Sequence, residues 1–264
     1  MPTPTKLPLL SLNCRGEPIQ EDIEAGRGWT ERRDHFIDLV RTSGAWAFTA
    51  QECSLSIRAD LLEALGGGDA WGYWANGNVM VWGRKSRLQR IAANDDLILP
   101  SPDNGIIRRL VVVRFRVYNP DDSTWKITGS TIDVASAHFT VGDPYWQNLQ
   151  MQAVIDELRT HWNIRNAVFG ADLNNSNVTG ECPRTIGTRN GFIELWNKAG
   201  RDVISNDLAN TWNGWRETVY GDQRIDGVFF GANLMPYYGK VIDTNGASDH
   251  NWIRASAVQL SDET

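Results

Sequence analysis

Short apolar runs alternate along the chain with stretches whose apolar residues recur every three or four positions. Residues 30–41 follow the second pattern, with Phe36 and Val40 on one face, which predicts an amphipathic helix. Residues 56–65 and 145–162 are predicted helices as well. The apolar runs carry β-branched and aromatic residues, as strands do. The predicted strands are 7–13, 45–51, 78–82, 106–117, 126–137, 166–170, 224–230 and 248–255.

This mixture of strands and helices predicts a layered α/β protein. The adjacent strands in the middle of the chain indicate hairpins, and therefore mixed rather than purely parallel sheets. Without repeats or Pro- and Ser-rich linkers, we expect one domain over residues 1–264. The aromatic cluster at residues 71–74 is expected in a loop.

The composition limits the classes of partner. With a net charge of −6 and a pI of about 5.3, the chain does not fit a protein that holds nucleic acid on a general basic surface. Transient contact with a nucleic acid substrate remains open, because a bound metal supplies local positive charge. We find neither a membrane-spanning run nor a signal peptide, so we expect a cytoplasmic monomer without integral membrane association.

The three cysteines are Cys14, Cys53 and Cys182, without a CxxC spacing. This pattern indicates neither a disulfide framework nor a zinc ribbon. Buried free thiols are the favoured interpretation, and a disulfide between Cys14 and Cys53 is the less favoured alternative.

Polar side chains stand where several predicted strands end or begin. Each one alone would be an ordinary turn former or cap. Together they form a set of acids, amides and imidazoles at strand ends, where α/β folds place their chemistry. The set consists of Asn13, Glu52, His138, Asp172, Asn174, Asp226, Asp249 and His250.

This set specifies a chemistry. Carboxylate and amide oxygens are ligands for hard cations, so Mg²⁺ is expected, with Mn²⁺ or Ca²⁺ as alternatives. An HExxH motif and a cysteine cluster are both missing, which disfavours zinc. An imidazole beside a carboxylate supplies a general acid or base near neutral pH. A hard metal combined with such pairs suits the cleavage of phosphate esters.

The motifs resemble those of the endonuclease/exonuclease/phosphatase superfamily, which has the deoxyribonuclease I-like fold. They run in the family's order as SLN, AQE, SAH, GADLN, RID and SDH, ending at Asn13, Glu52, His138, Asn174, Asp226 and His250. The resemblance covers about residues 7 to 255. It implies a four-layer α/β/β/α sandwich of two mixed sheets flanked by helices.

The resemblance also implies roles for the residues. Asn13 and Glu52 are expected at the metal, with Asp249 near it. Asp172 is expected to orient or deprotonate the attacking water, and Asn174 to contact the phosphate. The remaining three are expected in acid–base roles: His250 oriented by Asp226, and His138 on the phosphate or leaving-group side. Whether Asp172 or His250 takes the proton is left open.

Two positions depart from the family pattern. The deoxyribonuclease branch has an acid near Asn78 as the partner of the histidine that matches His138, and GNVMVWG here contains no carboxylate. Some repair endonucleases carry a second acid two residues after the first Asn, where this chain has Arg15.

A nuclease acting on DNA is the favoured function. Trp146 is a candidate for stacking on bases, and Arg84 and Arg109 are candidates for contacts with phosphates. A lipid or small-molecule phosphodiesterase or phosphatase, similar to sphingomyelinases, is the second interpretation. The third is a catalytically inactive binding module.

Overall fold

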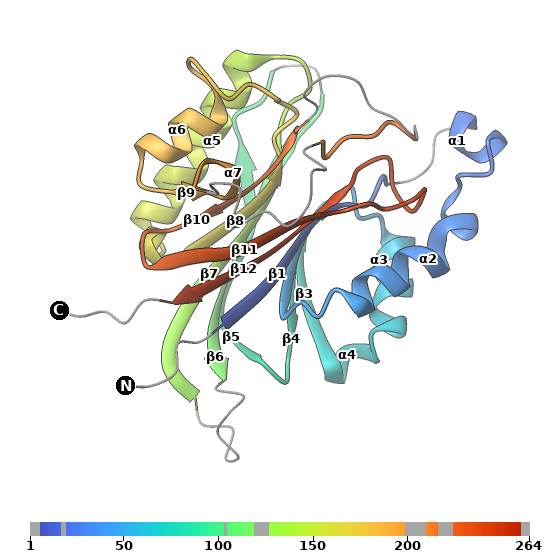
Figure 1. Cartoon of the computed structure of the whole chain (residues 1–264), viewed down its shortest axis with the longest axis horizontal. Coiled ribbons are helices and arrows are strands. Elements are labelled where there is room, and N and C mark those ends of the chain that lie inside the picture. Colours follow the sequence, from blue (N-terminus) through green and yellow to red (C-terminus); the bar gives the residue numbers. More distant parts are fainter. Residues whose placement is uncertain are drawn as a thin grey trace.

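Two six-stranded sheets packed face to face form the centre of the molecule, and helices lie outside each of them (Figure 1). The computed structural model describes residues 6–16, 20–102, 105–118, 127–198, 210–215 and 224–259. The arrangement is the four-layer sandwich that the sequence resemblance implies, with two mixed sheets. In the described part of the chain, none of the helices has the length and apolar character needed to cross a bilayer.

Each sheet has one parallel pair of strands near its centre. The first sheet contains β1 (Lys6–Asn13), β2 (Ala47–Gln51), β3 (Trp71–Asn76), β4 (Val79–Arg84), β11 (Leu234–Ile242) and β12 (Trp252–Gln259). The second contains β5 (Leu88–Leu99), β6 (Arg108–Tyr118), β7 (Ile127–His138), β8 (Ala167–Asp172), β9 (Ile193–Glu194) and β10 (Asp226–Phe230). Their orders are β11-β12-β1-β2-β4-β3 and β5-β6-β7-β8-β10-β9. The pairs β1–β2 and β7–β8 are parallel, whereas the other named pairings are antiparallel.

The helices are divided between the two sheets. On the side of the first sheet are α1 (Gln20–Glu24), α2 (Trp29–Thr42), α3 (Leu55–Ala64) and α4 (Gly67–Ala70). On the side of the second are α5 (Pro144–Thr160), the 3₁₀ helix Ile164–Asn166, α6 (Pro183–Arg189) and α7 (Leu195–Lys198). The start of α5 is fixed by Pro144 in its first turn and by Asp143, whose carboxylate accepts the backbone N–H of Tyr145.

The strands are apolar on both faces because both faces are covered. In β6, Val111 and Val113 face the space between the sheets, whereas Leu110 and Val112 pack toward α5. This double burial explains why the strand has a nearly continuous apolar sequence. On the other side, α2 buries Phe36 against the first sheet, as its periodicity predicts.

The prediction of a loop at residues 71–74 is wrong. These residues belong to β3, where Tyr73 pairs with Trp82 across the hairpin and their rings lie 4.7 Å apart. Their aromatic side chains pack on neighbouring strands instead of projecting from a loop. The strands β5 and β11 were also not predicted.

The last predicted strand begins later than expected. It starts at Trp252 rather than at residue 248. The four residues before it form a connection in which His250 makes an isolated bridge with Trp212. Asp249 and His250 therefore precede β12 and lie at the end of the sandwich where β1 finishes.

The two sheets approach each other closely at Gly170. A Cβ atom there would lie 2.3 Å from Thr49 Oγ1 and 2.9 Å from Ser11 Oγ on the opposite sheet. We expect Gly170→Ala to lower the free energy of unfolding by about 1–3 kcal/mol, because the sheets must separate to admit the methyl group. Urea denaturation measures this change.

Gly68→Ala is the matched control. An added Cβ at Gly68 meets no atom within 4 Å. The control should leave the free energy of unfolding unchanged within about 0.5 kcal/mol or raise it. Equal losses in the two variants would contradict the tight packing at Gly170.

Candidate functional site

The central parallel strands of both sheets end at the same end of the sandwich. Asn13 is the last residue of β1, and Glu52 directly follows β2. His138 and Asp172 are the last residues of β7 and β8, and they lie opposite each other in the strand register. The fold thus brings together four polar side chains that are far apart in the sequence.

The side-chain amide of Asn13 connects the two sheets. Its Nδ2 donates to Glu52 Oε1 at 3.0 Å and to Asp172 Oδ2 at 3.0 Å. Its Oδ1 accepts the backbone N–H of Arg15 at 2.8 Å, which fixes the orientation of the amide. Asn13 is almost completely buried, so these bonds are not exchanged for bonds to bulk water.

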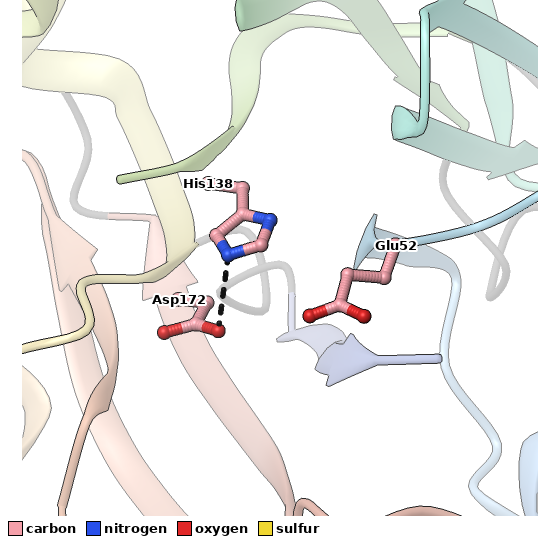
Figure 2. A group of neighbouring side chains, drawn as sticks. All are labelled: Glu52, His138 and Asp172. Carbon is pink, nitrogen blue, oxygen red and sulfur yellow. Dashed lines mark ion pairs between the residues drawn. The ribbon is translucent and has the colours of Figure 1, made fainter. Parts of the chain in front are cut away.

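Asp172 lies at the centre of the site. Its Oδ1 accepts the backbone N–H of Asn174 at 2.9 Å, and its Oδ2 lies 3.5 Å from His138 Nε2 (Figure 2). The same Oδ2 is 3.8 Å from His250 Nε2. Burial, together with the charge of Asp226, raises the pKa of Asp172 to about 7. A carboxyl group with that pKa exchanges protons readily at neutral pH.

His250 and Asp226 form a buried ion pair. Nδ1 of the imidazole lies 2.9 Å from Asp226 Oδ2. Burial alone would lower the pKa of His250, but the facing carboxylates, Asp226 foremost, raise it to about 10. The imidazole is therefore a cation at neutral pH. The backbone N–H of Asp226 donates to Thr211 Oγ1 at 3.0 Å and fixes the start of β10.

His138 has the opposite electrostatic character. Burial is the main cause that lowers its pKa to about 4, and the positive charge of Arg108 contributes. His138 is thus neutral at pH 7. The carboxylate of Asp172 lies beside its imidazole ring. In Figure 2 the carboxylate of Glu52 points toward these two side chains from across the cluster. These acids occupy its surroundings in place of one on the strand near Asn78.

Arg15 pairs with Asp249 beside this cluster. A guanidinium nitrogen of Arg15 lies 3.4 Å from Asp249 Oδ2, and Nε lies 3.1 Å from Asp22 on α1. Asp249 Oδ1 is buried without a hydrogen-bond partner in the described structure. Burial raises the pKa of Asp249. The position that carries an acid in some repair endonucleases here carries a cation that partly neutralises the site.

Two groups of side chains have ligand atoms within 4.8 Å of one another. One consists of Glu52, His138 and Asp172, and the other of Asp172, Asp226 and His250. The first fits a divalent cation better, because the second contains the His250 cation. Asp249 belongs to neither group, although its Oδ1 is a buried oxygen without a hydrogen-bond partner in the described structure. Asn13 presents its N–H groups to the acids, which makes it a support for Glu52 in this arrangement.

Asn174 is held by a network that the sequence did not reveal. Its backbone is left-handed, with φ of 49°, and its Nδ2 donates to Phe139 O at 2.9 Å. The buried side chain of Gln147 donates to Asn174 O and Thr140 O, both at 2.8 Å, and accepts from Asn175 Nδ2 at 2.6 Å. Gln147 therefore ties the loop after β8 to the segment after β7.

The three expected substrate contacts lie in different places. Arg84 ends β4, and Gly83 beside it pairs with Ala47 at the start of β2, so Arg84 lies at the end of the sheet remote from Glu52. Arg109 donates to Asn76 Oδ1 at 2.5 Å. Trp146 lies in the first turn of α5, partly buried, with its ring 5.4 Å from that of Tyr145.

Arg108, adjacent to Arg109, faces the acids of the site. Burial lowers the pKa of Arg108, while the carboxylates of Asp172 and Glu52 act in the opposite direction. Its Nε is buried without a hydrogen-bond partner in the described structure. The strand alternation alone could not distinguish the two arginines, because both stand at the beginning of β6.

Comparisons with known proteins establish the fold. No protein-family model and no curated protein matches the sequence. An endonuclease/exonuclease/phosphatase family protein from Bacteroides thetaiotaomicron is similar in structure, with 18% identity and a TM-score of 0.81 over 97% of this chain and 99% of that one. A mannosyl-6-phosphatase from the same organism has 18% identity and a TM-score of 0.77, over 96% and 99%. D. rerio TDP2, complexed with a single-strand DNA product, has 17% identity and a TM-score of 0.68, over 96% and 99%.

The network around Gln147 makes a prediction about stability. Gln147→Leu should lower the free energy of unfolding by at least about 2 kcal/mol, because the Thr140 and Asn174 carbonyl groups and the buried Asn175 amide lose a partner. Urea denaturation of Gln152→Leu serves as the control, since Gln152 donates to the exposed Asp156 on the same helix. A control variant as unstable as Gln147→Leu would contradict the importance of the network.

The pair of His250 and Asp226 predicts a pH dependence. In the folded protein the pKa of His250 is raised to about 10, whereas in the unfolded chain it is about 6.5. The ion pair therefore contributes fully to the free energy of unfolding below about pH 6.5, and this contribution is lost as the pH rises through 10. In EDTA, the wild type should lose more stability between pH 7 and pH 10 than Asp226→Asn does. Asp38→Asn, on the exposed side of α2, should keep the wild-type slope. Parallel slopes in all three proteins would refute the coupling.

Proposed function

Because the chain has the fold of the endonuclease/exonuclease/phosphatase proteins, we propose that it hydrolyses phosphate esters with the help of a divalent metal ion. The observation that carries the proposal is the cluster around Asp172, where acids and imidazoles from both sheets meet. The fold alone would not support an activity, since one fold hosts many functions. The cluster supplies the chemistry that this activity requires.

Glu52 is the residue that would hold the metal, with the carboxylate of Asp249 near it. Mg²⁺ or Mn²⁺ suits these donors, and Ca²⁺ is an alternative. When bound, such an ion polarises a phosphate oxygen and stabilises the charge that develops on the ester. Asn13 would keep Glu52 in place through its amide.

In this proposal Asp172 accepts the proton of the attacking water. Its pKa of about 7 suits a general base, and the Asn174 N–H orients its carboxylate. His250 is unsuited to that role, because its pKa of about 10 keeps it protonated. The His250 cation, held by Asp226, instead stabilises negative charge on the phosphate.

His138 and Arg108 are proposed on the phosphate side of the site. A neutral imidazole has one N–H, and His138 would donate it to a phosphate or leaving-group oxygen. The guanidinium of Arg108, which faces the acids of the site, would add a positive charge there. The amide of Asn174 would supply a third contact near the same group.

DNA is the substrate proposed from the sequence, and the structure supports this choice only in part. Tyr145 and Trp146 near the site could stack on bases, and the similar TDP2 structure contains a DNA product. Arg84 lies at the end of the sheet remote from Glu52 and does not support this choice.

A phosphomonoesterase is the second candidate. Arg15 and Arg108 place two positive charges beside the acids, and a terminal phosphate carries more negative charge than a diester. The similarity to a mannosyl-6-phosphatase fits this candidate. The inactive binding module would require that purified protein bind one of these substrates without turnover.

Metal-dependent turnover tests the proposal. With Mg²⁺ or Mn²⁺ the protein should hydrolyse bis(p-nitrophenyl) phosphate, and EDTA should abolish the reaction. Asp172→Asn should reduce kcat at least about 100-fold by removing the base, while Asp38→Asn should retain wild-type kcat. Full activity in EDTA or in Asp172→Asn would overturn the mechanism. A panel of plasmid DNA, single-stranded DNA, RNA, p-nitrophenyl phosphate and sphingomyelin then identifies the substrate class.

A further inference from the structure

A fully buried arginine lies behind the candidate site, on the helix α6 that covers the second sheet (Figure 1). The side chain of Arg184 is only 1% exposed, so it is shielded from solvent and from a bound substrate. A guanidinium group is almost never buried so completely unless it is paired, because it keeps its charge in a folded protein. The partners of Arg184 therefore indicate what this side chain does.

Arg184 has three hydrogen-bond partners, and two of them belong to the backbone at the start of β10. Its Nη1 donates to the carboxylate of Glu194 on β9. Its Nη2 donates to the carbonyl oxygen of Asp226 at 2.8 Å and to that of Arg224. The guanidinium thus joins α6 to β9 and, at the same time, to the residues at which β10 begins.

The backbone at the start of β10 is held at each of its carbonyl groups. Between the two carbonyls that Arg184 binds, Ile225 O accepts the backbone N–H of Leu173 at 2.8 Å. All three carbonyl groups of residues 224–226 therefore accept a hydrogen bond. Arg184 supplies two of these three bonds, so removing it would free most of the segment.

This segment determines where the carboxylate of Asp226 lies. Asp226 stands opposite Asp172 in the register of β8 and β10, and its Oδ2 is 2.9 Å from Nδ1 of His250. The imidazole approaches from the other sheet, because His250 lies two residues before β12. A displacement of the start of β10 would therefore change the distance between Asp226 and His250.

On the basis of the proposed function, we propose that Arg184 is a positioning residue of the site. It fixes the start of β10, so that Asp226 orients the His250 cation toward the phosphate. A guanidinium suits this task because its donors form a rigid fork that reaches several acceptors at once, whereas a lysine offers a single ammonium group. An ion pair that served only to join α6 to β9 would require Glu194 but neither of the two carbonyl groups.

Three variants separate positioning from the ion pair. Arg184→Lys keeps a positive charge beside Glu194 but cannot bind the carboxylate and both carbonyl groups together. The double variant Arg184→Met with Glu194→Leu removes the whole pair without leaving a buried charge, and it decides the question if Arg184→Lys does not fold. Glu194→Gln removes the charge of the carboxylate and keeps the guanidinium on the two carbonyls.

Arg114→Lys is the matched control. Arg114 also forms an ion pair within the second sheet, with Nε 2.6 Å from Oδ1 of the buried Asp133. Asp133 lies opposite Ala167 at the start of β8, whereas Asp172 ends that strand. The control therefore makes the same substitution in an ion pair at the remote end of the sheet.

Each variant is measured in two ways, after urea denaturation has verified that it is folded. One measurement gives kcat and KM for bis(p-nitrophenyl) phosphate with Mg²⁺. The other is the NMR spectrum of the ring nitrogens of His250 in EDTA, in protein labelled with ¹⁵N-histidine, which requires no turnover. The chain has four histidines, and the signals of His250 are assigned by their absence in His250→Gln.

We expect Arg184→Lys and the double variant to lower kcat about tenfold and to change KM less than about twofold, because a displaced imidazole stabilises the transition state less but still admits the ester. The His250 ring signals should move or broaden in both variants. Glu194→Gln and Arg114→Lys should keep the kcat and the His250 signals of the wild type.

Unchanged His250 signals in Arg184→Lys and in the double variant would overturn the positioning role, whatever happens to kcat. Equal losses of kcat in Arg184→Lys and Arg114→Lys would overturn it as well, since any ion pair of the sheet would then have the same effect. A wild type without metal-dependent turnover would refute the proposed function. In that case, displaced His250 signals in the Arg184 variants would still support Arg184 as the residue that positions Asp226.

Discussion

A single amide group holds the site together. Nδ2 of Asn13 donates to an acid on each sheet, Glu52 on one side and Asp172 on the other. Both bonds can form only if the ends of β1 and β8 stay in register across the sandwich. That register is set by the apolar core between the sheets and by the close approach at Gly170. The geometry of the site is therefore a property of how two sheets pack, more than of any one loop.

Positive charges in the site offset the negative charges of its buried acids. Four acids, Glu52, Asp172, Asp226 and Asp249, are placed near one another in a largely buried region, where unpaired charges are costly. Protonated His250 offsets one of them, and Arg15 offsets another. Asp172 lies deepest among them, and burial together with the charge of Asp226 raises its pKa, although Arg108 also faces it. A divalent cation bound among these acids would offset their remaining negative charge.

The sequence predicted the site better than the elements around it. Polar residues that interrupt apolar runs are visible in one dimension, and Asn13, Glu52, His138 and Asp172 do lie together. Gln147 could not be found this way, because a glutamine in an amphipathic helix is ordinary until the fold places carbonyl groups beside it. The strand Trp71–Asn76 was missed because its aromatic cluster was interpreted as a loop, although its partner strand follows directly after the two-residue turn Gly77-Asn78.

The pairing of the first sheet has a consequence for synthesis. β1 lies between β2 and β12, with Lys6 opposite Val258, so the first described strand needs the last one as its neighbour. During translation, β1 therefore exposes an unpaired edge until almost the whole described chain has left the ribosome. Asp249 and His250 arrive with that final strand. A nascent chain accordingly lacks part of the candidate site until its last described strand is made, and a chaperone that shields the edge of β1 would protect the chain during most of its synthesis.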